Sequence, residues 1–258
     1  MSIKIENTEV MGWEAAFRGM RNPKNSWDRS DTIMKSTVLK AEEIASGVTV
    51  YNQEYCAPYP VIGPNDLKLA MQLRNAGPEH AKFLRMIVVT CDITAPLYWW
   101  KEFDTYKVGT VANSCSTMHK IADKEFTLDD FSHEHLDDIW KYEPDIQNMA
   151  PVIGFETHTD RITNYLLGPD DILNLTIKML NRCRNLYNDT KDKKYWWQMI
   201  QLLPSSYNQK RTVFLNYWVL VNIYHQRQHH KQDEWRITFC DWIKSLPYSN
   251  LITGDESK

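Results

Sequence analysis

Residues 95–120 read APLYWWKEFDTYKVGTVANSCSTMHK, and the fold expected for this chain depends most on this stretch. Its first part is apolar and aromatic at helical spacing, whereas its second part is polar and built of small residues. Cys115, Ser116 and His119 lie close together there, and their residue types can supply a nucleophile and its base. Sequence neighbours rarely form such a pair, because the base usually comes from elsewhere in the fold. By themselves, the three residues predict no reaction.

Short strands and helices are predicted before this stretch. Runs rich in Ile, Val and Thr indicate strands, and apolar residues three or four positions apart indicate helices. Asn65 is of the type that caps a helix start, and Gly77 is of the type that follows a helix end. The predicted elements are a strand at 3–5, a helix beginning near residue 10, a loop at 21–32, helices at 36–47 and 65–77, and a buried strand ending before Pro96.

Helices dominate the prediction after this stretch. Residues 122–160 are acidic, broken by prolines and weakly periodic, so we expect an irregular insertion there. The chain shows no internal repeat and no shift in composition, and residues 1–258 are therefore predicted to form a single α+β domain. Helices are expected at 170–188, 194–204, 209–227 and 232–246.

Composition places the chain among globular proteins and excludes several partners. Of its 258 residues, 43% are hydrophobic, which is enough for a sizeable core. The net charge of -3 gives no general attraction to a nucleic-acid polymer or an anionic membrane, so any phosphate site must be local. Five cysteines without a C-x-x-C pair favour a reducing compartment. No apolar run resembles a membrane span or a leader, and a cytoplasmic protein is expected.

Common cofactor and metal motifs are absent or weak. Neither G-x-G-x-x-G nor G-x-x-x-x-G-K-[ST] occurs, which disfavours the two usual glycine-rich phosphate sites. His133 and His135 form an H-x-H beside carboxylates, but a metal site needs further ligands, and a solvated helix start explains these residues adequately. No metal is expected. Ten tryptophans and thirteen tyrosines indicate large buried contacts, subunit interfaces or a site walled by aromatic rings.

The polar half of the opening stretch resembles the signature of the flavin-dependent thymidylate synthases (ThyX), R-H-R-x-x-S-x-N-E-x-S-x-R-Y. Residues 111–119, VANSCSTMH, match its second half when Asn113 and Ser116 are aligned with the asparagine and the second serine. Three signature positions differ. Ser114 stands where the family has glutamate, Met118 where it has arginine and His119 where it has tyrosine.

The first half of the signature matches in either of two registers. With one inserted residue, TYKVGT at residues 105–110 falls on R-H-R-x-x-S, so that Lys107 keeps a positive charge and Thr110 a hydroxyl. Without the insertion, the triplet is Tyr106, Lys107 and Val108. Two cationic side chains of the signature are lost in either register.

Two further stretches resemble the family, in the same order along the chain. GPEHAKF, at residues 77–83, is similar to its E-H-x-x-F element, whose histidine region lies at the flavin. YWWQMIQLLP and the segment after it resemble the A-R-x-x-L-P turn and the helix that follows, with Ile200 in place of the arginine. That helix retains two asparagines and an arginine, here Asn216, Asn222 and Arg227.

The resemblance implies a fold, ligands and residue roles. The fold would be α+β, with helices packed around a small antiparallel sheet, in a homotetramer. The family reduces FAD with NADPH and transfers a one-carbon group from methylenetetrahydrofolate to dUMP. The implied catalytic residue is Ser116, the implied cofactor-binding residues are His80, Lys107, Asn216 and Asn222, and the implied nucleotide-binding residues are Asn113, Ser114, Ser116 and Arg227.

The missing arginines leave three functions open. Met118 and Ile200 provide neither charge nor donor, and each charge-assisted hydrogen bond contributes about 1.5–3 kcal/mol. Binding of dUMP as in the family would therefore be weaker by orders of magnitude. The chain is predicted to be a divergent enzyme acting on a pyrimidine nucleotide, a non-catalytic protein that sequesters or senses one, or a structural oligomer whose asparagines only cap and cross-link helices.

Overall fold

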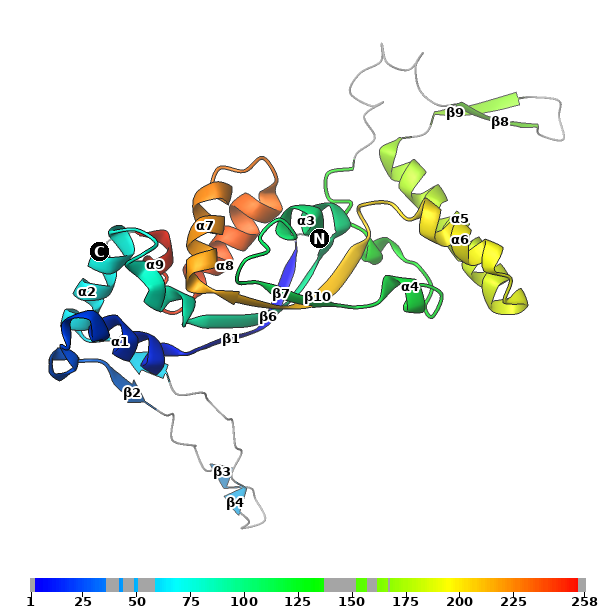
Figure 1. The fold of residues 1–258 in the computed structure, drawn as a ribbon. Helices are drawn as coiled ribbons and strands as arrows, with labels where there is room; N and C mark the ends of the chain where they lie inside the picture. Colours follow the sequence, from blue (N-terminus) through cyan, green and yellow to red (C-terminus); the bar gives the residue numbers. More distant parts are fainter. Residues whose placement is uncertain are drawn as a thin grey trace. The chain divides into compact units, whose positions relative to one another are not determined.

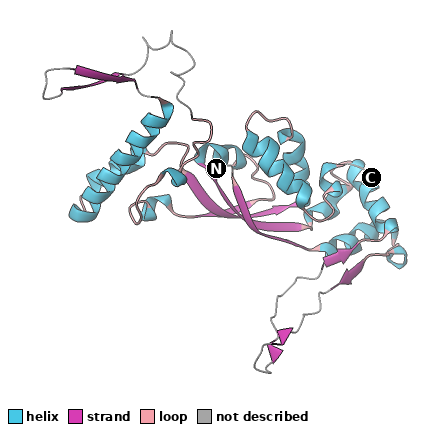
Figure 2. Ribbon diagram, turned by 180° about the vertical axis from the view of Figure 1, so that it is seen from behind, coloured by secondary structure: helices cyan, strands magenta, loops and turns pink. Residues whose placement is uncertain are grey.

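The computed structural model describes residues 3–35, 59–136 and 168–254, and the backbone of short strands at 42–43, 49–50, 152–156 and 162–166. Helices pack around a small antiparallel sheet, so the predicted α+β class is confirmed (Figure 2). The chain divides into two compact units. We call them the sheet unit (residues 5–93, 104–113 and 212–258) and the hairpin unit (residues 1–4, 94–103 and 114–211).

The main sheet has four strands in the order β1-β6-β10-β7 (Figure 1), and most of β1, β6 and β7 belongs to the sheet unit. In β6, the buried Val89, Cys91 and Ile93 alternate with half-buried neighbours, as the period of two in a strand requires. A separate antiparallel pair joins β2 to β5, with Met34 opposite Pro60. These strands are β1 (Lys4–Met11), β2 (Ile33–Lys35), β5 (Tyr59–Val61), β6 (Val88–Pro96), β7 (Val111–Ser114) and β10 (Asn208–Asn216).

The helices of the sheet unit enclose an aromatic core. The buried Trp13 ring meets the rings of Tyr217 and Tyr248 edge-on, at centroid distances of 5.3 Å and 5.7 Å. Edge-to-face pairs of this kind stabilise a core beyond the burial of their area. The helices are α1 (Trp13–Arg21), α2 (Pro64–Asn75), α7 (Tyr217–Arg227), a π-helical turn (Glu234–Phe239), α8 (Cys240–Ser245) and α9 (Asn250–Thr253), with 3-10 turns at Asn22–Lys24, Trp27–Arg29 and Ala81–Arg85.

Strand β10 passes directly into helix α7. Asn216 ends the strand, and its Oδ1 accepts a hydrogen bond from the backbone N–H of Val219 at 3.0 Å, which caps the helix. The next residue, Tyr217, donates its backbone N–H to the Ile87 oxygen at 3.0 Å and its hydroxyl to the Pro247 oxygen at 2.5 Å. Burial raises the pKa of the Tyr217 phenol, which therefore stays protonated as a donor.

The hairpin unit is built on two long helices, α5 and α6, which lie side by side (Figure 1). Lys191, in the left-handed region at φ 56°, reverses the chain between them, and the Asp192 carboxylate caps α6 by accepting the Lys194 N–H at 3.0 Å. Leu180 and Met199 from the two helices are fully buried with Phe131. The elements are α3 (Leu97–Phe103), α4 (Thr117–Lys120), a 3-10 turn (Leu128–Asp130), β8 (Val152–Glu156), β9 (Ile162–Leu166), α5 (Pro169–Thr190) and α6 (Lys193–Leu202).

Two of the predicted helices are wrong in part. The helix expected at 209–227 begins only at Tyr217, because the segment before it forms β10, where Val213 and Leu215 are buried on alternate positions. Within the helix expected at 36–47, Glu42–Glu43 forms β3, which pairs with β4 (Thr49–Val50). The remainder of 36–47 lies outside the described residues.

Other boundaries differ in detail. Helix α2 begins after Gly63 rather than at an Asn65 cap, and the Asp31 carboxylate accepts the backbone N–H groups of Asn65 and Asp66 at 2.8 Å and 2.9 Å. The strand β7 inside the opening stretch was not expected from the sequence. The single domain with an insertion at about 122–160 stays a prediction, and residues 137–151 and 157–160 of that insertion lie outside the described residues. None of the described helices is long and apolar enough to cross a membrane.

A buried ion pair fixes the loop after α1 onto α2. The Arg21 guanidinium lies 2.6 Å from the Asp66 carboxylate, and both side chains are buried. The same carboxylate accepts hydrogen bonds from the Ser30 and Thr32 hydroxyls at 2.7 Å and 2.6 Å. Burial alone would raise the pKa of Asp66, but the hydrogen bonds from Thr32 and Ser30 and the Arg21 charge lower it overall.

We expect Asp66→Asn to lower the free energy of unfolding by about 3 kcal/mol at pH 7, because it leaves the buried Arg21 without a counter-charge. Since the folded-state pKa of Asp66 is lowered, its stabilisation is present above about pH 4 and is lost as the pH falls through that pKa. Urea unfolding of wild type and variant across this range measures the difference. The exposed Asp28→Asn serves as the control, with a change below about 0.5 kcal/mol. Equal losses in the two variants would contradict the expectation.

Candidate functional site

The residues expected to bind ligands fall into both units. Ser114 and Ser116 belong to the hairpin unit, and the others belong to the sheet unit. In the sheet unit, the expected residues are His80, Lys107, Asn113, Asn216, Asn222 and Arg227.

Arg227, the last residue of α7, is held between aromatic rings. Its Nε donates a hydrogen bond to the Tyr106 hydroxyl at 2.8 Å, and that hydroxyl donates to the Gln226 side chain at 2.9 Å. The guanidinium carbon lies 4.9 Å from the centre of the Trp235 ring and 5.5 Å from that of Tyr106. Cation–π contacts and a fixed hydrogen bond reduce the freedom of the guanidinium before any ligand arrives.

Asn216 sits where the loop before β7 meets the start of α7. Its Oδ1 is used by the helix cap, and a methyl group added at Gly109 would lie 2.8 Å from its Nδ2 and 3.0 Å from Val219 Cγ2. Gly109 also has φ +79°, in the left-handed region that glycine adopts without strain. The loop therefore approaches α7 this closely because residue 109 has no side chain. Only the Nδ2 group of Asn216 is left to contact a ligand.

The other expected residues of the sheet unit are exposed. Among the described residues, the side chains of His80, Lys107, Asn113 and Asn222 make no hydrogen bond to the protein, so each can engage a ligand. Asn222 lies on α7, the helix that also carries Arg227, and Lys107 lies in the loop that carries Tyr106. Asn222 is thus on the same helix as Arg227, and Lys107 is next to Tyr106 in the sequence.

Ser116 lines a cavity of about 280 Å³ in the hairpin unit. Its Oγ accepts the His119 backbone N–H at 3.2 Å and caps α4. This hydrogen bond between Ser116 and His119 therefore uses the backbone of His119 and not its imidazole ring. The cavity has cationic, anionic and hydroxyl side chains. Among the described residues, its polar lining consists of Thr94, Cys115, Ser116, Thr117, Lys120, Lys124, Asp129, Asp130, Tyr207, Asn208, Gln209 and Lys210.

Strand β10 orders this cavity. The Gln209 side chain donates to the Cys115 oxygen and to the Thr117 hydroxyl, both at 3.0 Å, and the Cys115 N–H donates to the Lys210 oxygen at 3.0 Å. Burial, with the nearby Asp130 charge, raises the pKa of Tyr207, which stays a neutral hydroxyl at pH 7.

The charge of the cavity comes from lysines that neighbour carboxylates. Lys120 lies 2.8 Å from Asp123, and Lys124 lies 2.6 Å from Asp130. The hydrogen bond to Asp123 raises the pKa of Lys120, so this ammonium stays charged at neutral pH. The three lining lysines, Lys120, Lys124 and Lys210, are matched by the two lining aspartates and by Asp123, so the charges at the cavity balance. The cavity therefore offers donors and acceptors but no net attraction for an anion.

Sequence reasoning missed these lysines and the aromatic partners of Arg227. Lys210 was expected on a helix, and nothing in the spacing of the lysines relates them to one another. Tyr106 was identified only as a member of the signature triplet, in either register, and Trp235 carried no signal. Met118, in the position of a signature arginine, is exposed, whereas Ile200 packs against the hydrophobic core of the hairpin unit.

No group of three metal-ligating side chains occurs in the part of the chain that the structure describes. His133 uses Nδ1 in a 2.9 Å hydrogen bond with the Phe131 oxygen. This contact positions His133 locally and involves no other histidine.

Comparison with solved structures finds the same fold over almost the whole chain. Two crystal structures of ThyX from Helicobacter pylori, both with FAD and dUMP, match with a TM-score of 0.58 and 12% identity over 98% of this chain and 98–99% of theirs. The UMP/dUMP methylase PolB from Streptomyces cacaoi, bound with 5-Br dUMP, matches with a TM-score of 0.50 and 11% identity, over 98% of this chain and 95% of that chain. No protein family model and no curated protein matches the sequence. The sequence resemblance to the flavin-dependent thymidylate synthases is thus confirmed at the level of the fold.

We expect Gly109→Ala to destabilise the protein more than Gly77→Ala, by about 1 kcal/mol or more, because only at residue 109 does the new methyl group meet other atoms. Both glycines have positive φ, so both variants carry a strain of about 1–2 kcal/mol. Around Gly77, nothing described lies within 4 Å of the added carbon. Thermal and urea unfolding of the two variants measures the difference. A larger loss for Gly77→Ala would show that residue 109 is not closely packed.

Proposed function

We propose that this chain is a divergent flavin-dependent thymidylate synthase-like protein that binds FAD and a pyrimidine nucleotide. The observation that carries the proposal is the likeness of 98% of the chain to a protein solved with FAD and dUMP, together with the likeness to a methylase solved with 5-Br dUMP. The residues retained from the family motifs support this proposal, because most of them have side chains that a ligand can still contact.

Arg227 is proposed to contact the base of the nucleotide. Its hydrogen bond to Tyr106 and its contact with Trp235 hold the guanidinium in one orientation, so little rotamer entropy is lost on binding. Asn113, Ser114 and Ser116 are proposed to contact the nucleotide as well, through one amide and two hydroxyl groups. Ser116 would also be the catalytic residue if the chain is an enzyme.

FAD is proposed to lie at His80, Lys107, Asn216 and Asn222. When bound, FAD supplies two-electron reduction, with NADPH as the reductant and methylenetetrahydrofolate as the carbon donor in the enzymatic case. The residues fit the cofactor in a limited sense. His80, Lys107 and Asn222 are exposed, whereas Asn216 offers only its Nδ2, because its Oδ1 caps α7.

A non-catalytic role is the second candidate. The side chains that stand in place of two arginines of the family favour it. Met118 provides no charge, and Ile200 is engaged in the core of the hairpin unit, so neither can hold a phosphate. Binding without turnover needs only affinity, whereas transfer of a one-carbon group needs the reacting atoms to be aligned. Both candidates share the same fold and the same ligands and differ only in turnover.

Loss of the Asn216 amide N–H and of the Asn222 side chain should weaken the binding of FAD. Asn216→Asp keeps an oxygen that caps α7, so the fold is preserved while the donor is removed. We expect Asn216→Asp combined with Asn222→Ala to weaken FAD binding by at least about tenfold, measured by quenching of FAD fluorescence. The exposed Asn185→Ala is the control. If FAD fluorescence stays unchanged when wild type is added, the protein does not bind FAD and both asparagines have only a structural role.

Nucleotide binding should depend on Arg227. We expect Arg227→Ala to weaken the binding of UMP or dUMP by at least about tenfold, and Arg227→Lys to restore little, because a point charge cannot make two parallel hydrogen bonds. Calorimetric titration of wild type and both variants measures this. Tyr106→Phe removes only the hydroxyl and controls for the orientation of Arg227. Equal affinity of all four proteins for the nucleotide would show that Arg227 does not contact it.

Turnover separates the two candidates. Because Met118 and Ile200 stand in place of arginines, we expect no detectable dTMP from dUMP and methylenetetrahydrofolate in the presence of FAD and NADPH. A binding protein should instead show a rise in melting temperature with the nucleotide and no oxidation of NADPH. Formation of dTMP at a steady rate would show that other residues replace the missing arginines.

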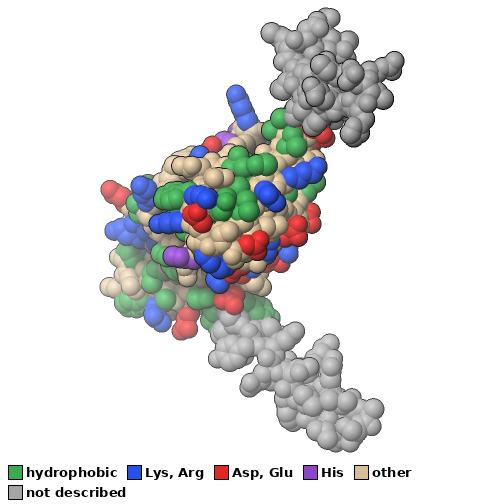
Figure 3. Space-filling view, turned by 90° about the vertical axis from the view of Figure 1, so that its right-hand side faces the viewer, with side chains coloured by type: hydrophobic (Ala, Val, Ile, Leu, Met, Phe, Trp, Pro, Cys, Tyr) green, Lys and Arg blue, Asp and Glu red, His purple; other side chains and the backbone are tan. Residues whose placement is uncertain are grey.

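A homotetramer is also proposed, and the hairpin unit offers a surface for it. Ile172, Leu175 and Met179 are exposed at three- and four-residue spacing on α5 and so lie along one stripe of the helix. Hydrophobic side chains lie exposed among basic and acidic ones on the face shown in Figure 3. Helix α5 begins with Asp170 and Asp171 and carries Lys178 and Arg182 further along, so an antiparallel contact with a second copy would bring opposite charges together. Light scattering of the purified chain would measure the assembly.

A further inference from the structure

A cavity of about 630 Å³ lies in the sheet unit, and none of its lining residues belongs to the candidate site. Its volume is within the range of pockets that hold small molecules. Among the residues that the structure describes, the lining contains four aromatic side chains and no charged one. It consists of Thr8, Val10, Trp13, Tyr59, Pro60, Val61, Trp242, Ser245, Leu246, Pro247 and Tyr248.

Hydrogen bonds fix the walls of this cavity on several sides. Trp242 Nε1 donates to the Thr8 hydroxyl at 3.0 Å, which holds α8 against β1. The Tyr248 hydroxyl accepts the Ile62 N–H at 2.9 Å and donates to the Pro60 oxygen at 3.2 Å, which holds the segment after α8 against β5. The cavity is therefore formed before any ligand binds, and binding costs little reorganisation.

Tyr248 is held in a backbone conformation that tyrosine rarely adopts. Its φ is +50°, in the left-handed region that disfavours a side chain of this size. A residue in such a conformation is found where several contacts hold it in place. Here these contacts are the two hydrogen bonds of the Tyr248 hydroxyl and the edge contact of its ring with Trp13. These contacts keep the Tyr248 ring in the wall of the cavity despite the strained backbone.

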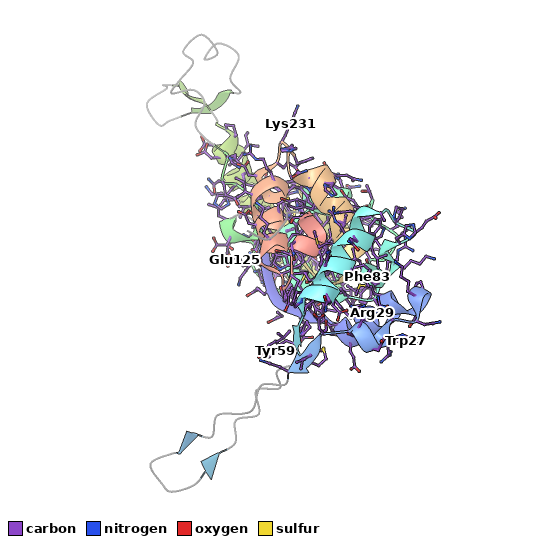
Figure 4. The ribbon with its side chains drawn as sticks, turned by 90° about the vertical axis from the view of Figure 1, so that its left-hand side faces the viewer. Trp27, Arg29, Tyr59, Phe83, Glu125 and Lys231 are labelled. Atoms are coloured by element: carbon purple, nitrogen blue, oxygen red, sulfur yellow. The ribbon has the colours of Figure 1, made fainter. Side chains whose placement is uncertain are left out.

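The hydroxyls at the cavity have defined roles. Thr8 Oγ1 accepts from Trp242, and within the described residues its hydrogen has no acceptor, so it can donate to a ligand. Ser245 Oγ donates to the Trp242 oxygen at 2.7 Å, so its lone pairs can accept. Both residues are exposed, and so is Tyr59, which Figure 4 labels at the surface on β5. The buried Trp13 lies deeper, so the cavity has an aromatic interior and one donor and one acceptor near solvent.

We propose that this cavity binds a planar, uncharged aromatic ring that carries a hydrogen-bond donor and a hydrogen-bond acceptor. Aromatic walls favour a flat ring through stacked and edge-on contacts. Because the described part of the lining has no charged residue, a carboxylate or phosphate there would lose its hydration and gain no charged partner, so charged ligands are disfavoured. The site is separate from the proposed FAD and nucleotide residues and does not depend on their function.

The probe for the test is quinolin-2(1H)-one, a bicyclic lactam with this donor and acceptor, and ligand-observed NMR titration of the full chain measures its binding. We expect a dissociation constant of about 1 mM or tighter for wild type, which is reasonable for so small a ligand. Quinoline-2-carboxylate, of similar size but charged, should bind at least about tenfold more weakly. Equal binding of the two probes, or no saturable binding of the lactam, would overturn the proposal.

Two matched variants locate the binding. Ser245→Trp places a large ring at the cavity and should weaken lactam binding by at least about tenfold, whereas Lys244→Trp, one position earlier on α8 and outside the lining, should change it less than about twofold. Thr8→Val keeps the size of the side chain, removes the donor and should weaken binding by about fivefold. Melting temperatures confirm that each variant is folded. Equal effects of the two tryptophan variants would place the lactam elsewhere and contradict the proposal.

Discussion

The sheet unit depends on the junction at which strand β10 becomes helix α7. There Asn216 closes the strand and caps the helix, while the buried Tyr217 binds the Ile87 and Pro247 oxygens. These bonds set the direction of α7, and with it the position of Arg227 at its end, beside Tyr106. The Pro247 bond also fixes a lining residue of the aromatic cavity. One local structure thus determines much of the fold, the candidate nucleotide contact and the wall of a second cavity.

Sequence patterns predicted the elements that have one clear period and a clear stop. Strand β6 and helices α5 and α6 were of this kind, because apolar spacing and the residues at their ends agree. Strand β10 was missed because no glycine or proline separates it from α7, so the helical period after Tyr217 was extended backwards. Motifs identified single residues, but the cavity at Ser116 draws its lysines from separate segments. Such a grouping exists only in the folded chain.

The cations at the Ser116 cavity are lysines, which bind a phosphate differently from arginines. An arginine fork makes two parallel bonds and fixes the orientation of the anion, whereas a lysine is a point charge on a flexible stem. At the Ser116 cavity, Lys120 and Lys124 are also partly neutralised by Asp123 and Asp130. A ligand anion there would meet no excess of positive charge and no fork that aligns it, so the cavity does not provide the exact positioning that group transfer requires.

The cysteines differ sharply in their surroundings. Burial raises the pKa of the Cys91 thiol to about 12 and, with the nearby Asp241 charge, that of Cys240 to about 11, and Cys183 is buried as well. These three thiols are therefore inert at neutral pH. Cys115 alone among the four cysteines that the structure describes is exposed, and it lines the cavity at Ser116. An environment-sensitive fluorophore coupled there would report occupancy of the cavity in real time, without any engineered attachment point.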